Sequence, residues 1–179
     1  MHTYRTHSCA DLRQDHIGQT VKLSGWVSRK RDHGGVLFID LRDTYGLTQC
    51  VIDEGSSLLE EAEKCRVESC ITITGQVRQR PGETQNKNMS TGDIEVYIDE
   101  LTIQSTAKVI PFQIAEDDGA GEEIRLKYRY LDLRREKMQK NIRLRNDVIF
   151  AIRAEMQNQG FQEFQTPILT ASSPAVSYT

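Results

Sequence analysis

Between residues 20 and 105, apolar and other residues alternate in short segments, and this pattern restricts the fold more than any other feature of the chain. Successive side chains of a β-strand point to opposite faces, so a period of two predicts strands with one buried face. Five such segments lie at 21–27, 36–41, 47–52, 71–77 and 94–103. Between the third and fourth, Leu58, Leu59, Ala62 and Cys65 recur at helical spacing. This order predicts a mainly β protein built on a five-stranded OB-fold barrel, although spacing alone leaves other small barrels open.

The second and third segments form a hairpin whose register can be predicted. Residues 43–46, Asp-Thr-Tyr-Gly, are a turn signal because the glycine can adopt a positive φ. With Thr44 and Tyr45 at the tip, Asp40 opposes Gln49, and opposed residues share a face. One face is apolar and predicted to be interior: Leu37, Ile39, Leu41, Cys50 and Ile52. The other face is predicted to point outward: Phe38, Asp40, Arg42, Leu47 and Gln49.

Phe38 is the unusual member of the outward face, because a ring beside acidic, basic and amide side chains is unlike a core position. Such a ring is a platform on which an unpaired base can stack, a contact that contributes about 1–3 kcal/mol per base. Gln49 offers both a donor and an acceptor to a base edge. The structural alternative, that Phe38 packs under a loop or on the neighbouring helix, stays open from the pattern alone.

A basic stretch at 28–35 is predicted to connect the first two strands, at one edge of the ligand face of OB barrels. Cations at that edge would contact phosphates and offer guanidinium planes for stacking. Five cations are predicted to approach this face: Arg29, Lys30, Arg31, Arg78 and Arg80. A basic surface turn without a partner is the alternative.

In the last third of the chain, the spacing of the apolar residues changes from the period of a strand to that of a helix. The stretch at 107–123, which is acidic from residue 116 onward, is predicted to be a linker, and a basic segment at 125–145 is either a solvated helix face or a surface that meets phosphates. Gly160 is placed to end a helix, and 161–164 is predicted to be a short strand. The apolar stripe of that helix consists of Met138, Ile142, Ile149, Ile152 and Met156. We expect this stripe to lack a partner surface within this chain.

Composition excludes several classes of protein. No apolar run approaches the roughly 18 residues of a membrane span, and the N-terminus lacks the apolar core of a secretory signal, so a cytoplasmic location is expected. The net charge of -3 gives no whole-chain indication of nucleic-acid binding. The four cysteines have no Cys-x-x-Cys spacing and no histidine cluster beside them, so we expect reduced packing thiols and no metal site.

Six stretches together resemble the bacterial aspartyl-tRNA synthetases, which are class II aminoacyl-tRNA synthetases. Five of them lie at 5–7, 25–27, 31–43, 91–95 and 125–135. The sixth, Gly-Phe-Gln-Glu-Phe-Gln-Thr-Pro-Ile-Leu at 160–169, resembles motif 1 of class II enzymes. The combination is specific, whereas the Gly-Gly-Val-x-Phe-Ile stretch alone is shared with asparaginyl and lysyl relatives.

The resemblance implies an anticodon-binding OB domain at 1–106, a linker at 107–123 and the start of a class II α+β catalytic domain, its first helix and strand, at 124–179. It implies that Phe38 stacks on the central anticodon base and that Gln49 bonds in the same pocket. His33 is implied to lie near the first and third anticodon bases, and relatives with His there accept tRNA-Asn as well as tRNA-Asp. The implied tRNA contacts are Arg29, Arg31, His33, Phe38, Gln49, Arg78 and Arg80. The implied dimer-interface residues of motif 1 are Gly160, Phe161 and Pro167.

The family reads G, U and C in the anticodon and joins aspartate to the tRNA through an aspartyl-adenylate, using ATP and Mg²⁺. At 175–179 the sequence departs from the family, which continues there with a glutamate that helps bind aspartate. Motifs 2 and 3 are absent, so we expect this chain to bind an anticodon without catalysis and to hold neither ATP nor metal. Three alternatives stay open: a stand-alone OB-fold module for single-stranded nucleic acid, an asparaginyl- or lysyl-type relative, and a structural remnant.

Overall fold

The computed structural model describes residues 2–116 and 118–169. The chain divides into two compact units, Met1–Leu131 and Asp132–Thr179. The domain boundaries at 106 and 123, which come from the resemblance, stay predictions beside this division.

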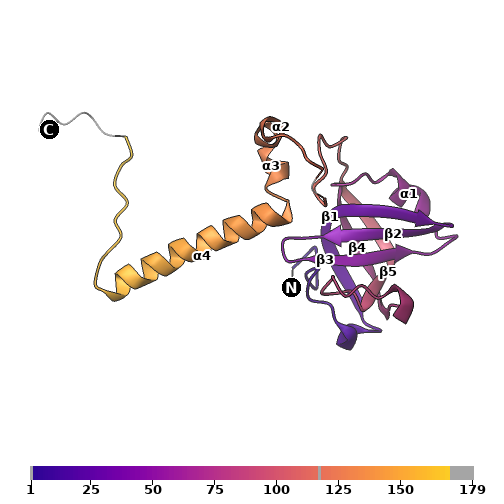
Figure 1. Cartoon of the computed structure of the whole chain (residues 1–179). Helices are drawn as coiled ribbons and strands as arrows, with labels where there is room; N and C mark the ends of the chain where they lie inside the picture. The colour runs from indigo at the N-terminus through magenta and orange to yellow at the C-terminus, as the bar shows by residue number, and fades with distance from the viewer. Residues whose placement is uncertain (1, 117, 170–179) are drawn as a thin grey trace, which may run out of the picture. The chain divides into compact units, whose positions relative to one another are not determined.

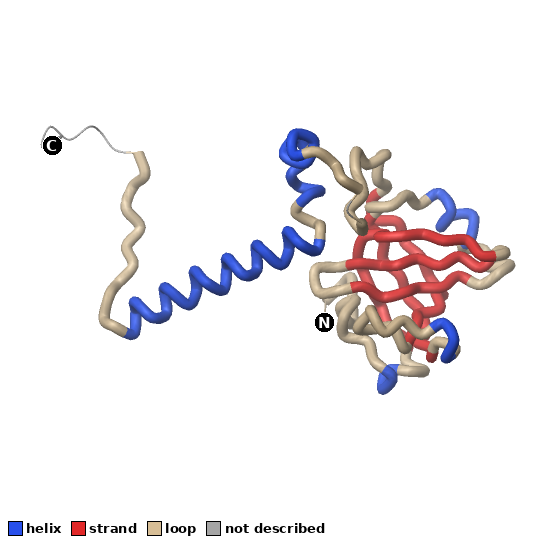
Figure 2. Tube along the Cα trace, viewed as in Figure 1, coloured by secondary structure: helices blue, strands red, loops and turns tan. Residues whose placement is uncertain are grey.

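The first unit is built on a closed barrel of five strands in the order β1-β2-β3-β5-β4 (Figures 1 and 2). The strands are β1 Thr20–His33, β2 Val36–Arg42, β3 Leu47–Ile52, β4 Cys70–Gln79 and β5 Ile94–Ser105. Neighbours are antiparallel except β3 and β5, which are parallel. One helix, α1 Leu59–Lys64, lies between β3 and β4. The predicted OB-fold barrel and the position of its helix are therefore confirmed.

The alternation of β2 and β3 separates the barrel core from the outside as predicted. Asp40 pairs with Gln49 and Ile39 pairs with Cys50. The five predicted interior side chains, Leu37, Ile39, Leu41, Cys50 and Ile52, all belong to the buried core. Because one face of each strand is buried, a slip of one residue would expose this whole set, and the register is therefore strongly specified.

Two strand glycines allow the barrel to close. A Cβ built on Gly25 would lie 2.3 Å from the carbonyl oxygen of Arg42, and one on Gly75 would lie 2.1 Å from that of Tyr97. Both contacts are with backbone, which cannot move aside as a flexible side chain could. The pairing of β4 with β5 is also irregular between Thr74 and Gly75. Gly25 and Gly75 thus mark the positions where neighbouring strands approach most closely.

The first strand is longer than predicted, and the basic stretch at 28–35 is not a loop. β1 continues to His33, and only Gly34 and Gly35, with φ of +64° and +92°, turn the chain into β2. The register with β2 shifts between Val27 and Arg29, as in a β-bulge. A bulge adds one residue to a strand, so the residues after it reverse their order of faces. This reversal removes the alternation that would have predicted a strand.

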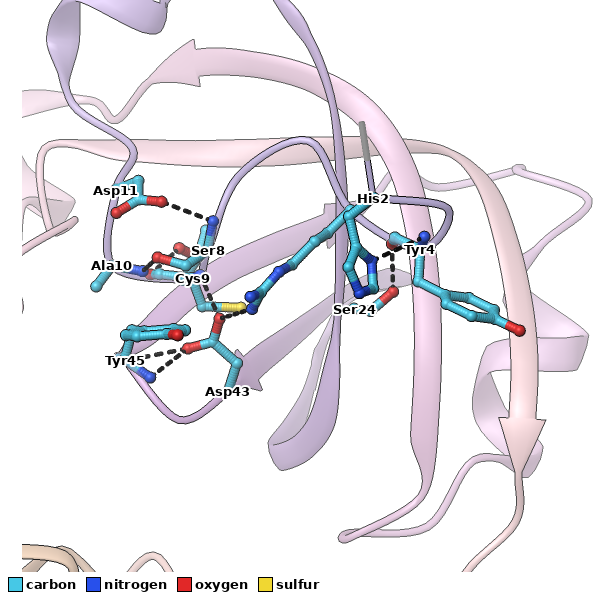
Figure 3. Close-up of polar contacts among 12 residues, drawn as sticks. His2, Tyr4, Ser8, Cys9, Ala10, Asp11, Ser24, Asp43 and Tyr45 are labelled. Atoms are coloured by element: carbon cyan, nitrogen blue, oxygen red, sulfur yellow. Dashed lines mark hydrogen bonds and ion pairs between the residues drawn. The ribbon is translucent and has the colours of Figure 1, made fainter.

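The segment before β1 is fastened to the barrel through the β2–β3 turn. The Asp43 carboxylate accepts hydrogen bonds from the backbone N–H groups of Cys9 (2.8 Å), Tyr45 (2.8 Å) and Gly46 (2.9 Å). Figure 3 shows Asp43 between the Cys9 segment and Tyr45. The Thr48 hydroxyl donates to the Cys9 carbonyl at 2.6 Å. Cys9 is fully buried in the barrel core, so this segment completes the hydrophobic interior.

A second, smaller hydrophobic core is formed by residues that follow β5 in the sequence. Phe112, Ile114 and Leu131 are buried together, and Ile124 and Tyr128 pack against them. The remaining short helices of the chain are η1 Gln14–His16, η2 Gly82–Thr84, α2 Glu122–Lys127 and α3 Arg129–Asp132. Part of the stretch at 107–123 is thus packed rather than fully solvated.

The second unit contains the long helix α4 Glu136–Asn158, as the apolar period predicted. Gly160, with φ of +86°, follows its last turn, which is the expected position of a helix-ending glycine. The helix has no buried residue, and its stripe residues Ile142, Ile149 and Ile152 are 43%, 37% and 58% exposed. The strand predicted at 161–164 is wrong, because these residues are not in a strand. A strand needs a neighbour for its backbone hydrogen bonds, and the segment has none among the described residues.

Residues 170–179, including the stretch that departs from the family, lie outside the described residues. Within the described part of the chain, no helix is both long and apolar enough to span a bilayer.

Candidate nucleic-acid interface

The outer face of the barrel presents two rows of side chains across β1, β2 and β3. In one row Arg29 pairs with Asp40, and Asp40 pairs with Gln49. In the other row Arg31 pairs with Phe38, and Phe38 pairs with a valine of β3. Directly opposed residues of antiparallel strands share a face, so both rows lie on the same surface. We call this surface, together with its continuation onto β5 and β4, the outer face.

The outer face continues onto β5 and β4 through two residues that the site prediction did not include. Ile94, Val96 and Ile98 are buried in the core, so Glu95 and Tyr97 point outward between them. Glu95 lies opposite Arg78 in the register of β4 and β5. The same alternation in the sequence of β5 could have identified Glu95 and Tyr97 as members of this face.

A chain of polar contacts connects Arg31 to Glu95 across four strands, β1, β2, β3 and β5. An Arg31 Nη2 donates to Asp40 Oδ1 at 2.7 Å and to Gln49 Oε1 at 3.3 Å. The other side of the Gln49 amide, Nε2, donates to Glu95 Oε2 at 2.9 Å. These contacts determine which end of the Gln49 amide is the oxygen and which is the nitrogen. They leave one N–H and one oxygen lone pair of the amide for another partner.

Asp40 and Glu95, the two acids of this chain of contacts, are equally enclosed. The Asp40 side chain is 8% exposed, against 39% for Arg31. Burial raises the pKa of the Asp40 carboxyl, and this outweighs the opposite effect of the nearby Arg31 and Arg29 charges.

Phe38 is half-buried, and its ring meets that of His33 edge to face. The two ring centroids are 5.8 Å apart and the planes are inclined by 72°. Such a T-shaped contact is a favourable arrangement of aromatic rings. The structure therefore brings together the two side chains that were predicted to lie near the central and flanking anticodon bases.

The two arginines at the end of β4 differ in exposure. Arg78 is exposed, and its guanidinium lies 3.9 Å from the centre of the Tyr97 ring, a cation–π contact. Arg80 is only 4% exposed, with Nε 3.9 Å from Glu95 Oε2. Burial lowers the pKa of the Arg80 guanidinium. Within the described residues, its Nε and Nη2 atoms have no hydrogen-bond partner.

Two further cations have protein partners of their own. Arg29 is exposed and forms an ion pair with Glu116. Lys30 Nζ donates to the carbonyls of Ala62, Glu63 and Cys65, at 3.3, 2.6 and 2.8 Å. These carbonyls lie at the end of α1, where helix carbonyls lack partners. The expectation that Lys30 contacts phosphate is therefore corrected, because this side chain caps α1.

Both parts of the chain are similar to known proteins. Residues 21–104 match the family model of the OB-fold nucleic acid binding domain, and residues 121–178 match that of the class II tRNA synthetases (D, K and N). An aspartate–tRNA(Asp/Asn) ligase from Gluconobacter oxydans is 60% identical over 97% of this chain, and one from Zymomonas mobilis is 54% identical over the same share. Nearly the whole chain is therefore similar to the aspartate–tRNA(Asp/Asn) ligases. The chain spans 29% of the length of each of these two relatives.

Solved structures agree with this similarity and with the barrel. The asparaginyl-tRNA synthetase of Pyrococcus horikoshii, in complex with asparaginyl-adenylate, is 25% identical with a TM-score of 0.78. That match covers 90% of this chain and 36% of the Pyrococcus chain. A putative aspartyl-tRNA synthetase from Leishmania major, at 22% identity and a TM-score of 0.81, shows the same fold over 99% of this chain and 38% of its own.

The residues that resemble motif 1 lie in the second unit. Gly160 ends α4, Phe161 is 57% exposed, and Pro167 is exposed. Their role at a dimer interface stays a prediction.

The residues present do not form a metal site. Throughout 2–116 and 118–169, no group of three or more His, Cys, Asp or Glu side chains could hold a metal ion. The Cys9 and Cys50 thiols are buried in the barrel core, which raises the pKa of both.

Proposed function

We propose that this chain is the anticodon-binding part of an aspartate–tRNA ligase and that its outer face binds the anticodon loop of tRNA-Asp. The observation that supports this most directly is the cluster of Phe38, Arg31 and Gln49 on one surface of an OB barrel. The two relatives at 60% and 54% identity are named as ligases for tRNA(Asp/Asn). An unpaired loop is the form of RNA whose bases can be splayed out and read by such a surface.

In the proposed complex, each side chain of the face has a distinct task. Phe38 stacks on the central base, U, and the remaining donor and acceptor of Gln49 bond to its edge. Exposed Arg29 and Arg78 contact phosphates, and Arg31 contacts a base beside Phe38. Arg80 is also proposed to contact the loop; because its guanidinium is buried beside Glu95, this contact requires the side chain to turn outward when the RNA binds.

His33 sets the proposed breadth of tRNA choice. Its ring contacts Phe38, so it lies beside the position of the central base and within reach of a neighbouring one. We propose that it admits tRNA-Asn as well as tRNA-Asp, whose anticodons differ only in the third base.

The proposal is tested with RNA stem-loops and the 179-residue chain. We expect a stem-loop with G-U-C in its loop to bind more tightly than one with the loop sequence scrambled. Equal affinity for both would favour a general binder of single-stranded nucleic acid. No affinity for either would favour a purely structural role.

The whole enzyme is proposed to act in the cytoplasm as a homodimer that contacts through Gly160, Phe161 and Pro167. When bound, ATP would supply the adenylyl group that joins the aspartate carboxylate as pyrophosphate leaves, and Mg²⁺ would offset the charge of the phosphates. No cluster of side chains in the described part of this chain fits that ion, so both are proposed to bind elsewhere in the full-length enzyme.

We therefore expect the 179-residue chain to activate no amino acid by itself. Activation needs a positive clamp on the ATP phosphates and a pocket for aspartate, which in this family follow motif 1. Aspartate-dependent exchange between pyrophosphate and ATP is the direct assay. Exchange above that of a chain-free blank would contradict this expectation.

A further inference from the structure

We propose that Asp40 is a positioning residue, a buried carboxylate that holds the Arg31 guanidinium on the outer face in its RNA-binding arrangement. The inference rests on the proposed function and adds to it a residue that does not itself contact the RNA. Asp40 lies in the middle of β2, between Arg29 of β1 and Gln49 of β3. Its side chain is only 8% exposed, whereas Arg31 above it is 39% exposed.

The contacts of Arg31 show how this positioning works. One of its nitrogens, Nη2, is fixed by Asp40 at 2.7 Å and by Gln49 at 3.3 Å. The Nε and Nη1 groups donate to no other described residue. The guanidinium is therefore anchored at one end and keeps donors for a ligand at the other. A side chain held in place before binding loses less conformational entropy on binding than a free one.

The surroundings of Asp40 combine both signs of charge. Arg31 and Arg29 face it from β1, Gln49 from β3, Glu95 from β5 and Arg80 from the end of β4. A carboxylate in an RNA-binding surface repels phosphate, and its burial has a desolvation cost. The ion pair with Arg31, and the orientation that it gives to the guanidinium, offset these two unfavourable effects.

The sign of the effect distinguishes this role from simple electrostatics. If Asp40 acted only as a negative charge near RNA, its removal would strengthen RNA binding. If it positions Arg31, its removal should weaken binding to the preferred loop. Asp40→Asn is the suitable change, because asparagine keeps the size of the side chain and removes its charge.

The experiment measures the affinity of the 179-residue chain for stem-loops whose loop contains G-U-C or G-A-C. We expect Asp40→Asn to weaken G-U-C binding by about tenfold, the effect of losing one charged hydrogen bond. The loss for G-A-C should be smaller. In the Arg31→Ala background, Asp40→Asn should cause no further loss of affinity, because its partner is already absent, and removal of the negative charge should leave affinity unchanged or slightly raised.

Two controls separate positioning from folding. Asp53→Asn removes an exposed acid next to β3 and should leave G-U-C affinity unchanged or slightly raised. Urea unfolding of each variant shows whether it is folded, and Asp40→Glu, which keeps the charge, replaces Asp40→Asn if that chain does not fold. Glutamate is one methylene longer than aspartate, so its carboxylate should not hold Arg31 in the same position. Asp40→Glu should therefore weaken G-U-C binding as Asp40→Asn does, and only in a chain that contains Arg31.

The outcomes are distinct. Asp40→Asn binding as tightly as the parent, or more tightly, overturns the inference and leaves the proposed function intact. Additive losses in the Arg31→Ala background overturn it as well, since they indicate an effect that does not pass through Arg31. A parent chain without preference for G-U-C over a scrambled loop overturns both the proposed function and this inference.

Discussion

Replacement of Phe38 by alanine tests the proposed stacking platform directly. The ring is half-buried, and one of its contacts is the T-shaped contact with His33 at 5.8 Å. Loss of an aromatic platform weakens single-strand binding by about 1–3 kcal/mol per stacked base. At 25 °C this corresponds to a roughly 5- to 150-fold rise in Kd for a G-U-C stem-loop. Phe38→Tyr, which keeps the ring, should bind within a few-fold of the parent.

The same variant also changes stability, and the neighbouring core position provides a matched control. Ile39, the next residue of β2, is fully buried, and Ile39→Val should lower the free energy of unfolding by about 0.5–1.5 kcal/mol. Because Ile39 faces the interior, its truncation should leave RNA affinity unchanged. A drop in affinity for Phe38→Ala without one for Ile39→Val would therefore come from the outer face.

Fluorescence anisotropy with a labelled stem-loop measures both affinities, and urea unfolding measures both stabilities. Tyr45→Ala is a second control, since this exposed aromatic residue lies on the β2–β3 turn instead of the outer face. If Phe38→Ala bound the G-U-C loop as tightly as the parent, the assignment of the outer face as the RNA-binding surface would be wrong.

Three further predictions follow from the same geometry. Arg78→Ala should reduce the slope of log affinity against log salt by about 0.7, the contribution of one phosphate contact with a single strand, whereas Lys30→Met should leave the slope unchanged and destabilise the end of α1. With His33 present, G-U-C and G-U-U stem-loops should bind within a few-fold of one another in a direct titration, and a strong preference for C would contradict the broad tRNA choice. Burial raises the pKa of Asp40 in the folded chain, so folded Asp40 binds a proton more readily than unfolded Asp40 does. Stability should therefore fall as pH rises from the unfolded pKa of about 3.9 through the folded value, and urea unfolding across this range should show that Asp40→Asn removes the decrease.

The barrel could be predicted from the sequence because its hydrophobic pattern is strict. Leu37, Ile39 and Leu41 of β2 and Cys50 and Ile52 of β3 recur at every second position, and the Asp-Thr-Tyr-Gly turn specifies which residues oppose one another. The pairing of Asp40 with Gln49 followed from these two facts alone. Phe38 could be assigned to the outside for the same reason, since its neighbours Leu37 and Ile39 are both core residues.

The partners of the cations could not be predicted, because they depend on contacts that are distant in sequence. Lys30 is 32 residues from the Ala62 carbonyl to which it donates. Arg80 is buried beside Glu95 only because β4 and β5 pair and β5 then closes the barrel against β3. A charged side chain in a polar stretch is usually solvated, so the sequence favoured exposure for both. The bulge after Val27 was missed because a single added residue imitates the loss of strand periodicity.

The strand expected at 161–164 illustrates a different limit. Phe161 and Phe164 are aromatic residues of the kind enriched in strands, but they are 57% and 77% exposed, and the segment is not in a strand. Sequence pattern reports a preference for a buried, paired environment, whereas a strand forms only where another strand supplies its hydrogen bonds. The helix α4 needs no such neighbour, because its hydrogen bonds are internal, and it could therefore be predicted.

If the outer face binds RNA as proposed, its charges explain how a chain with a net charge of -3 can do so. Arg31 is paired with Asp40, Arg80 lies beside Glu95, and Arg29 is paired with Glu116. Arg78 is exposed and rests on Tyr97. Each acid lowers the attraction for phosphate in general and fixes the direction in which an arginine presents its donors. Binding by such a face should depend on bases that fit beside Phe38 and Gln49 more than on bulk attraction. An RNA phosphate at Arg29 must also displace Glu116, which adds to the discrimination against loops that make only phosphate contacts.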